Sequence, residues 1–172
     1  MFRHLLSACG LIASIMLSSC MPSIPAYAVP LDVRTSKFRF SMDDVSANLA
    51  SLQMLWTSDN VKMSNMTQYN TLPGRDVAWD HPLETSPHIE ANKRIFFVFD
   101  TAYKNRRFEN YGDHCINYVS FVPEPDMSYI ARQVLTAERC FAEVIDEATG
   151  KEPTSLSRHN IDEATAFPFR TR

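Results

Sequence analysis

The sequence has 172 residues, of which 45% are hydrophobic and 22% are charged, and its formal net charge is −3. This length and apolar content suit one globular domain with its own core. Nucleic-acid binding depends on neutralising phosphates with Lys and Arg. A mildly acidic chain without blocks of like charge gives no basis for it, so we expect no nucleic-acid partner.

The beginning of the chain has the pattern of an export signal. A basic start at residues 1–4 precedes a mostly apolar run at residues 5–17, which is shorter than the roughly 20 residues that a membrane-spanning helix needs. Leu17-Ser18-Ser19-Cys20 then places small residues before a cysteine. This segment resembles a bacterial lipoprotein signal. The resemblance implies cleavage before Cys20 and attachment of acyl chains, such as palmitate, to that residue.

The same resemblance implies a location. The protein would be lipid-anchored in the bacterial envelope and would face the periplasm. Met21 follows the cysteine where a signal for inner-membrane retention usually has Asp, so the resemblance favours the outer membrane. We expect the N-terminal lipid to be the chain's contact with the membrane, because no later apolar run approaches spanning length.

A second cleavage site lies close by. Residues 26–28, Ala-Tyr-Ala, have the small-x-small pattern that ordinary signal peptidase cuts. Cleavage there would export the protein without a lipid. Both alternatives leave Cys115 and Cys140 as an even pair, so the cysteine count supports export but does not choose between them.

These features predict three regions. Residues 1–19 are the signal peptide, and residues 20–33 are the lipidated cysteine with a proline-rich linker. Residues 34–172 form a single α+β domain.

The first half of the domain predicts a strand and a helix. Residues 37–40 alternate charged and aromatic side chains, which is typical of a half-buried strand. Residues 41–56 begin with a capping pattern, and their apolar side chains recur at helical spacing: Met42, Val45, Leu49, Leu52 and Trp56. Residues 61–69 are a weaker strand candidate. Residues 70–92 predict a long loop that includes a Pro-Gly turn at residues 72–75.

The second half predicts the centre of the sheet and another helix. Residues 95–99 are apolar at every position, as expected for a central strand, and residues 115–122 are a second strand. A helix is expected from Asp126 to about Ile145, with an apolar stripe of Met127, Ile130, Val134, Ala137, Phe141 and Val144. Residues 151–172 are a short strand or a loose tail. The predicted fold is therefore α+β, an antiparallel or mixed sheet with two amphipathic helices packed on one face.

The two late cysteines predict a structural disulfide. Cys115 begins a predicted strand, and Cys140 lies in the last turns of the predicted helix that follows it. A strand–loop–helix unit folds back on itself, and an oxidising compartment favours the bond. Closing this loop would stabilise the fold by roughly 3.5 kcal/mol in the chain-entropy model.

A few residues predict possible chemistry. His81, His88, His114 and Asp113 are a metal-ligand alternative, although their spacing matches no known ligand motif. Asp100 follows the central strand, where active-site carboxylates often lie, but contact with water or with Arg94 is the favoured interpretation. No catalytic nucleophile motif or phosphate-binding loop is present in the sequence, so we expect no cofactor.

Aromatic and basic side chains in two predicted loops suggest a binding surface. Such side chains are enriched in the energetic centres of protein interfaces. They are Trp79, Arg106, Arg107, Phe108 and Tyr111.

Two functions follow from these patterns. The favoured one is a non-enzymatic envelope lipoprotein that binds a protein partner in the periplasm, as an inhibitor or immunity protein or as an accessory of an envelope assembly. The alternative is a small periplasmic hydrolase that uses the histidines with a metal or with acid–base chemistry.

Overall fold

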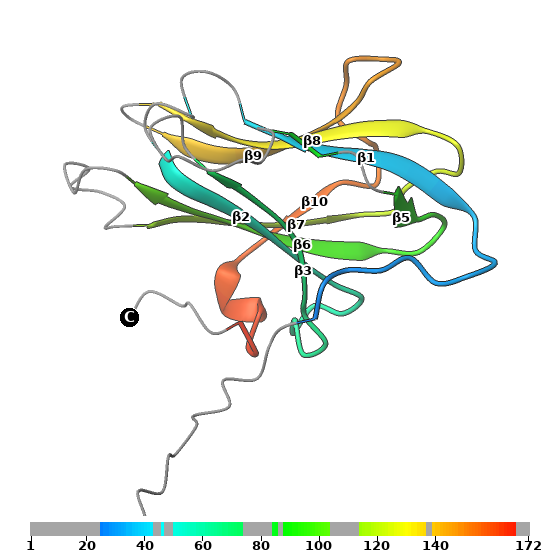
Figure 1. The fold of residues 1–172 in the computed structure, drawn as a ribbon, viewed down its shortest axis with the longest axis horizontal. Helices are drawn as coiled ribbons and strands as arrows, with labels where there is room; N and C mark the ends of the chain where they lie inside the picture. Colours follow the sequence, from blue (N-terminus) through cyan, green and yellow to red (C-terminus); the bar gives the residue numbers. More distant parts are fainter. Residues whose placement is uncertain are drawn as a thin grey trace, which may run out of the picture.

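Two β-sheets packed face to face form the domain, as Figure 1 shows. The structure is a computed structural model and describes residues 25–42, 46, 50–73, 84–85, 88–103, 114–136 and 139–167. Within these ranges, helical backbone is limited to Ser46 and the short 3-10 helix η1 (Ile161–Glu163). Among the same residues, no helix has the length and apolar character of a membrane span.

The β6 sheet has the strand order β10-β7-β6-β2-β3, and all its neighbours are antiparallel. Its strands are β2 (Ala50–Ser58), β3 (Thr67–Pro73), β6 (Ile95–Tyr103), β7 (His114–Phe121) and β10 (Ser157–His159). The predicted strands at 95–99 and 115–122 are confirmed, and β6 is the middle strand as expected. The candidate at 61–69 overlaps only the beginning of β3.

The β8 sheet has the order β4-β1-β8-β9, with β5 also paired to β1. Its strands are β1 (Thr35–Ser41), β4 (Glu84–Thr85), β5 (His88–Glu90), β8 (Ser128–Leu135) and β9 (Cys140–Asp146). β1 and β8 are parallel, and the other pairs are antiparallel. The strand predicted at 37–40 is confirmed as part of β1. The predicted loop at 70–92 contains the end of β3 and the short strands β4 and β5.

Aromatic side chains fill the space between the sheets. Phe38 of β1 stacks on Phe97 of β6 with ring centroids 4.8 Å apart, and Phe97 lies 5.8 Å from Phe121 of β7. Phe121 in turn meets Tyr129 of β8 at 5.1 Å. All four are at most 2% exposed. The strands alternate their side chains between the two faces, so each sheet contributes every second residue to this core.

The outer face of the β6 sheet carries a second apolar cluster. Trp56 and Tyr118 lie there with Phe167, which follows η1, and the rings of Trp56 and Phe167 are 6.4 Å apart. Tyr118 Oη donates a hydrogen bond of 2.5 Å to the Val61 carbonyl. The C-terminal segment and the β2–β3 connection therefore cover this face, and β2, β6 and β7 are buried on both sides.

The N-terminal residues of the described chain pair with the edge of the β6 sheet. Tyr27 N donates to the Gln68 carbonyl at 2.8 Å, and Gln68 N donates to the Pro25 carbonyl at 2.9 Å. The Tyr27 ring lies 5.5 Å from that of Tyr69, and its hydroxyl accepts a 3.1 Å hydrogen bond from Glu90 N. We call residues 25–28 the edge segment.

The α+β prediction is wrong, because the protein is a β-sandwich. The second half of the first predicted helix, residues 41–56, forms β2 instead. Leu55 faces the core between the sheets, whereas Trp56 faces the outer cluster. A strand covered on both faces carries apolar residues at both parities, and some of these fall at helical spacing by chance.

The second predicted helix is also wrong. Its sequence forms the β8–β9 hairpin, which turns where Thr136 N donates to the Arg139 carbonyl at 2.8 Å. The helical stripe included Ile130 and Val134, which lie on the partly exposed side of β8. The buried residues of β8 occur at alternate positions: Tyr129, Ala131, Gln133 and Leu135. A glutamine at one of these positions weakened the period-two pattern that identifies a strand.

Candidate functional site

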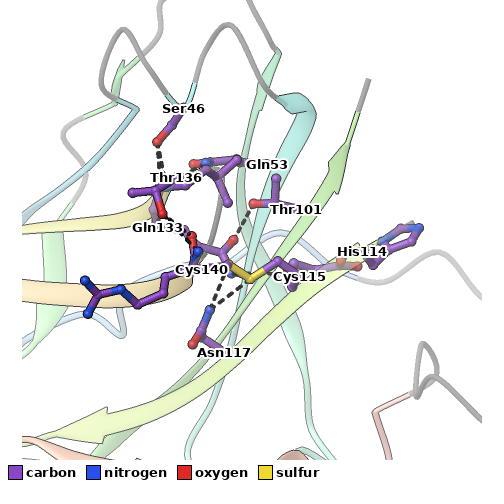
Figure 2. Close-up of a disulfide and its surroundings, with 12 residues drawn as sticks. Ser46, Gln53, Thr101, His114, Cys115, Asn117, Gln133, Thr136 and Cys140 are labelled. Atoms are coloured by element: carbon purple, nitrogen blue, oxygen red, sulfur yellow. Dashed lines mark hydrogen bonds and ion pairs between the residues drawn. A yellow bond between two sulfur atoms is a disulfide. The ribbon is translucent and has the colours of Figure 1, made fainter. Parts of the chain in front are cut away.

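A disulfide joins the two sheets, as Figure 2 shows. It links Cys115 of β7 to Cys140 of β9, with the Cα atoms 6.3 Å apart. Asn117 Nδ2 donates to both sulfur atoms, at 3.2 Å and 3.4 Å. The predicted disulfide is therefore present. Its predicted setting is wrong, because Cys140 begins a strand of the opposite sheet and does not end a helix.

Buried polar groups surround the disulfide (Figure 2). Gln133 Nε2 donates to Cys115 at two atoms, the carbonyl oxygen at 3.1 Å and Sγ at 3.0 Å, and Thr101 Oγ1 donates to Gln133 Oε1. The Gln133 carbonyl accepts from Gln53 Nε2 at 3.1 Å and from Ser46 Oγ at 3.3 Å. Because unsatisfied buried polar atoms are costly, this network fixes how the sheets sit on each other around the disulfide.

Asp100 and His114 form a carboxylate–imidazole pair on the outer face of the β6 sheet. Asp100 Oδ1 lies 2.8 Å from His114 Nδ1, and Asp100 is fully buried. Its second oxygen, Oδ2, has no hydrogen-bond partner. Burial raises the pKa of the Asp100 carboxyl, and the contact with His114 partly opposes that shift. The His114 side chain is 38% exposed, so the carboxylate orients a ring that reaches solvent.

The position of this pair relates it to the predicted binding residues. His114 opens β7 and lies opposite Ala102, near the end of β6. The connection between these strands, residues 104–113, carries Arg106, Arg107, Phe108 and Tyr111. The pair therefore stands where that connection leaves the sheet. The simple expectation for Asp100 is wrong, because it lies inside β6 and is shielded from water. Arg94 bonds to Ser120, Ser155 and Ser157 instead.

A serine, a histidine and a glutamate are aligned at the other end of the same face. Ser120 Oγ lies 2.8 Å from His159 Nε2, and His159 Nδ1 lies 3.5 Å from Glu163 Oε2. Arg94 Nη1 also donates to Ser120 Oγ at 2.9 Å. Ser120 is fully buried within the β7 ladder, so its hydroxyl is closed to a substrate. This group acts as a structural clamp that holds β10 and η1 to the sheet.

The structure does not bring together the two described histidines of the metal alternative. His88 pairs with Lys37 in the β8 sheet, beside Phe38, whose ring lies 6.1 Å from that of Phe121. His114 is at the opposite end of β7 from Phe121. At about 3.3 Å per residue, the length of β7 separates the two histidines by roughly 20 Å. Among the described residues, no group of three metal-ligating side chains is found.

Several predicted residues lie outside the described residues. They are Cys20, Trp79, His81, Arg106, Arg107, Phe108, Tyr111 and Asp113.

A groove lies beside the disulfide between the edge of the β8 sheet and the last strand of the β6 sheet. Its volume is about 340 Å³, and its walls come from β7, β9 and β10. They include Asn117, Phe141, Ala142, Arg158 and His159. Phe141 is 37% exposed, which is unusual among the large hydrophobic residues described here.

Sequence reasoning missed this groove and the serine–histidine clamp. The groove depends on which strands are neighbours, and that information is non-local. One signal was present for the clamp: Ser120 is a polar residue within an apolar strand, and Arg94 is a charge at the start of another. Buried polar residues inside strands require partners, so such positions indicate a network even where its members are unknown.

Together these features define a β-sandwich whose sheets are joined by a disulfide. This architecture serves many unrelated functions. Comparison of the chain with protein-family models, with curated proteins and with solved structures finds no match.

Proposed function

We propose that this chain is an exported lipoprotein of the bacterial envelope that is anchored through Cys20, faces the periplasm and binds a protein partner. The partner is a target of inhibition or immunity, or a component of an envelope assembly. The pairing of the edge segment with β3 is the observation that carries the proposed anchor. It bears on the choice between cleavage before Cys20 and cleavage after Ala28.

Cleavage after Ala28 would remove part of the folded domain. The edge segment contributes two backbone hydrogen bonds to Gln68, and Tyr27 contributes a ring contact with Tyr69 and a hydrogen bond with Glu90 N. Cleavage before Cys20 keeps all of these contacts. These contacts support the proposed cleavage before Cys20 over cleavage after Ala28, because only the former retains them.

The anchor would also hold the domain close to the membrane. The first residue paired with β3 follows Cys20 by only a few positions, and at about 3.5 Å per residue their separation is at most roughly 20 Å. Strands β3 and β10 are the two opposite edges of the β6 sheet. The tethered edge would then lie near the lipid, and the edge with the groove would lie away from it.

The disulfide is in keeping with export. Cys115 and Cys140 join two sheets, and such bonds persist in oxidising compartments such as the periplasm. Binding of a protein, in turn, is supported by the rigid clamped scaffold and by the exposed Phe141 beside a groove. Aromatic side chains at the edge of a groove are frequent anchors in protein interfaces.

The experiment that tests the anchor is intact-mass analysis of the mature protein purified from its native envelope. We expect an acylated N-terminal Cys20, and a Cys20→Ser variant that loses both the acyl mass and membrane fractionation. The matched control is Ala28→Asp, which blocks ordinary signal peptidase; its mature mass should change only by the substitution. An unacylated chain that begins at Val29 and is lost in Ala28→Asp would contradict the proposed anchor.

Partner binding is tested by chemical cross-linking in intact cells, followed by mass spectrometry of what is joined to the protein. If the predicted loop residues form the contact surface, a variant with Trp79→Ala, Arg106→Ala and Arg107→Ala should lose the cross-linked product. Its melting temperature should remain near that of wild type. An unchanged product would place the contact elsewhere on the domain.

A further inference from the structure

The outer edge of β9 carries backbone groups that no described residue pairs with. Hydrogen-bonded and non-bonded pairs alternate in an antiparallel ladder. In the β8–β9 hairpin the Thr136–Arg139 and Ser128–Glu147 pairs are both bonded, and they fix this alternation. Phe141, Glu143 and Ile145 are therefore bonded to β8. The N–H and C=O groups of Cys140, Ala142 and Val144 point the other way, out of the sheet.

The neighbouring sheet extends one strand further than β9. The disulfide and the Asn117 hydrogen bonds place β9 over β7. Beyond β7 the β6 sheet continues with β10, whereas within the described ranges the β8 sheet ends at β9. The position that faces β10 and lies beside β9 is the groove of about 340 Å³.

This geometry selects a single strand over a second copy of the domain. Two copies that paired through β9 in one continuous sheet would be related by a two-fold axis. Each β10 would then lie beneath the partner's β9, at the position that the partner's β7 already occupies. The clash follows from the offset of one strand between the sheets. One extended segment fits beside β9 without it.

We propose that β9 binds an extended segment of a partner protein, which adds to the β8 sheet as a further strand and lies in the groove over β10. This inference rests on the proposed protein-binding function and names the part of the partner that is bound. Backbone hydrogen bonds to Ala142 and Val144 hold such a segment, as in other cases of strand addition. An uncovered strand edge is otherwise a liability, which proteins avoid by covering it.

The groove also defines the side chains that the segment presents. Arg158 lies opposite Val119 in the β10–β7 pair, so it belongs to the face that looks toward the added strand. Both of its Nη atoms donate to Glu152, and both side chains are about half exposed, so a carboxylate on the bound segment would compete with Glu152 for this guanidinium group. Phe141 lines the same groove from β9, where its side chain has the opposite parity to Ala142, and it offers an apolar contact. The bound segment is therefore extended, with an acidic residue facing Arg158 and an apolar residue beside Phe141.

The experiment uses the complete mature protein and a random library of eight-residue peptides, with residue-resolved amide exchange as the readout. Peptides that bind the immobilised protein should slow exchange of the Ala142 and Val144 amide protons at least about tenfold. The amide protons of Phe141 and Glu143 are already bonded to β8 and should change little. Enrichment of acidic and apolar residues at positions of opposite parity in the bound peptides is also expected.

A matched pair of proline variants provides the control. Ala142→Pro removes an outward N–H but none of the bonds to β8, and it should weaken peptide binding at least about tenfold. Ala28→Pro makes the same change at the tethered edge and should leave binding unchanged. If Ala142→Pro does not fold, the exchange measurement on the native protein still decides the question.

Three outcomes would overturn the proposal. They are a library that yields no binder, protection confined to other strands, and protection of Ala142 and Val144 that grows with protein concentration in the absence of peptide. The last would assign the edge to a second copy of the chain. A cross-linked partner that protects other amides would refute strand addition but leave the protein-binding function standing.

Discussion

The two edges of the sandwich differ in what pairs with them. At the β3 edge, the edge segment pairs with β3, and Tyr27 packs on Tyr69. At the β9 edge, β9 is hydrogen-bonded to β8 on one side and joined to β7 by the disulfide. The backbone groups on its other side have no partner among the described residues. The chain therefore closes one edge with residues 25–28, whereas a covalent bond holds the strand at the open edge in place.

Removal of the disulfide should have the largest effect on this contrast. In the chain-entropy model, a loop closed by residues 25 apart stabilises the fold by roughly 3.5 kcal/mol. We expect the double variant Cys115→Ala with Cys140→Ala to lose about this much free energy of unfolding, measured by urea denaturation. Amide exchange in β9 should accelerate more than exchange in β3. Equal acceleration at both edges would mean that the disulfide does not specifically hold β9.

Loss of the Tyr27 side chain should affect the other edge. Tyr27→Ala removes the ring contact with Tyr69 and leaves the Glu90 N–H without its acceptor, so we expect about 2 kcal/mol of destabilisation. Thermal unfolding measures it. Leu31→Ala is the control, because Leu31 is 91% exposed and its loss should change stability little. Equal stability of Tyr27→Ala and wild type would show that the Tyr27 side chain contributes nothing to the stability of the fold.

The buried carboxyl of Asp100, in the strand between the two edges of the β6 sheet, should make stability depend on pH. Burial raises its pKa in the folded state, so over the pH range just above its ordinary pKa the folded protein binds more protons than the unfolded chain. Stability therefore falls as pH rises through this range. Asp100→Asn should remove that fall and stabilise the protein at pH 7 by about 1 kcal/mol. The measurement is the free energy of unfolding of both proteins from pH 4 to about 7. Parallel pH profiles for the two proteins would contradict the predicted effect of Asp100.

Arg158 should have the smallest effect on stability. Its ion pair with Glu152 is about half exposed, and such pairs contribute at most about 0.5 kcal/mol. We expect the free energy of unfolding of Arg158→Ala, measured by urea denaturation, to lie within this margin of the wild-type value. A loss several times larger would mean that Arg158 is needed to support β10 and is not free to contact a partner.

The sequence predicted the strands that alternate or that are apolar throughout. β1 alternates Phe38 and Phe40 with charged residues, and β6 is apolar around Phe97. The disulfide was also predictable, because the sequence after residue 20 contains only two cysteines, Cys115 and Cys140. These predictions depend on local sequence pattern or on the number of cysteines, and neither requires knowledge of the tertiary arrangement.

The sequence did not predict β2, β8 and β9 as strands, because their environment is non-local. β2 has apolar residues at both parities, since the segment that contains Phe167 covers its outer face. β8 buries Gln133, whose partners Thr101 and Cys115 come from other strands. The clamp around Ser120 and the groove beside Phe141 also arise from strand order, which no single-sequence period encodes.

Residue-resolved amide exchange on the mature protein, without any ligand, tests the contrast between the edges most directly. We expect slow exchange for the amide protons of Tyr27 and Gln68, which are hydrogen-bonded across the β3 edge. We expect fast exchange for the amide protons of Ala142 and Val144, which alternate with slowly exchanging neighbours on β9. Fast exchange at Tyr27 and Gln68, or uniform protection along β9, would contradict this contrast between the two edges.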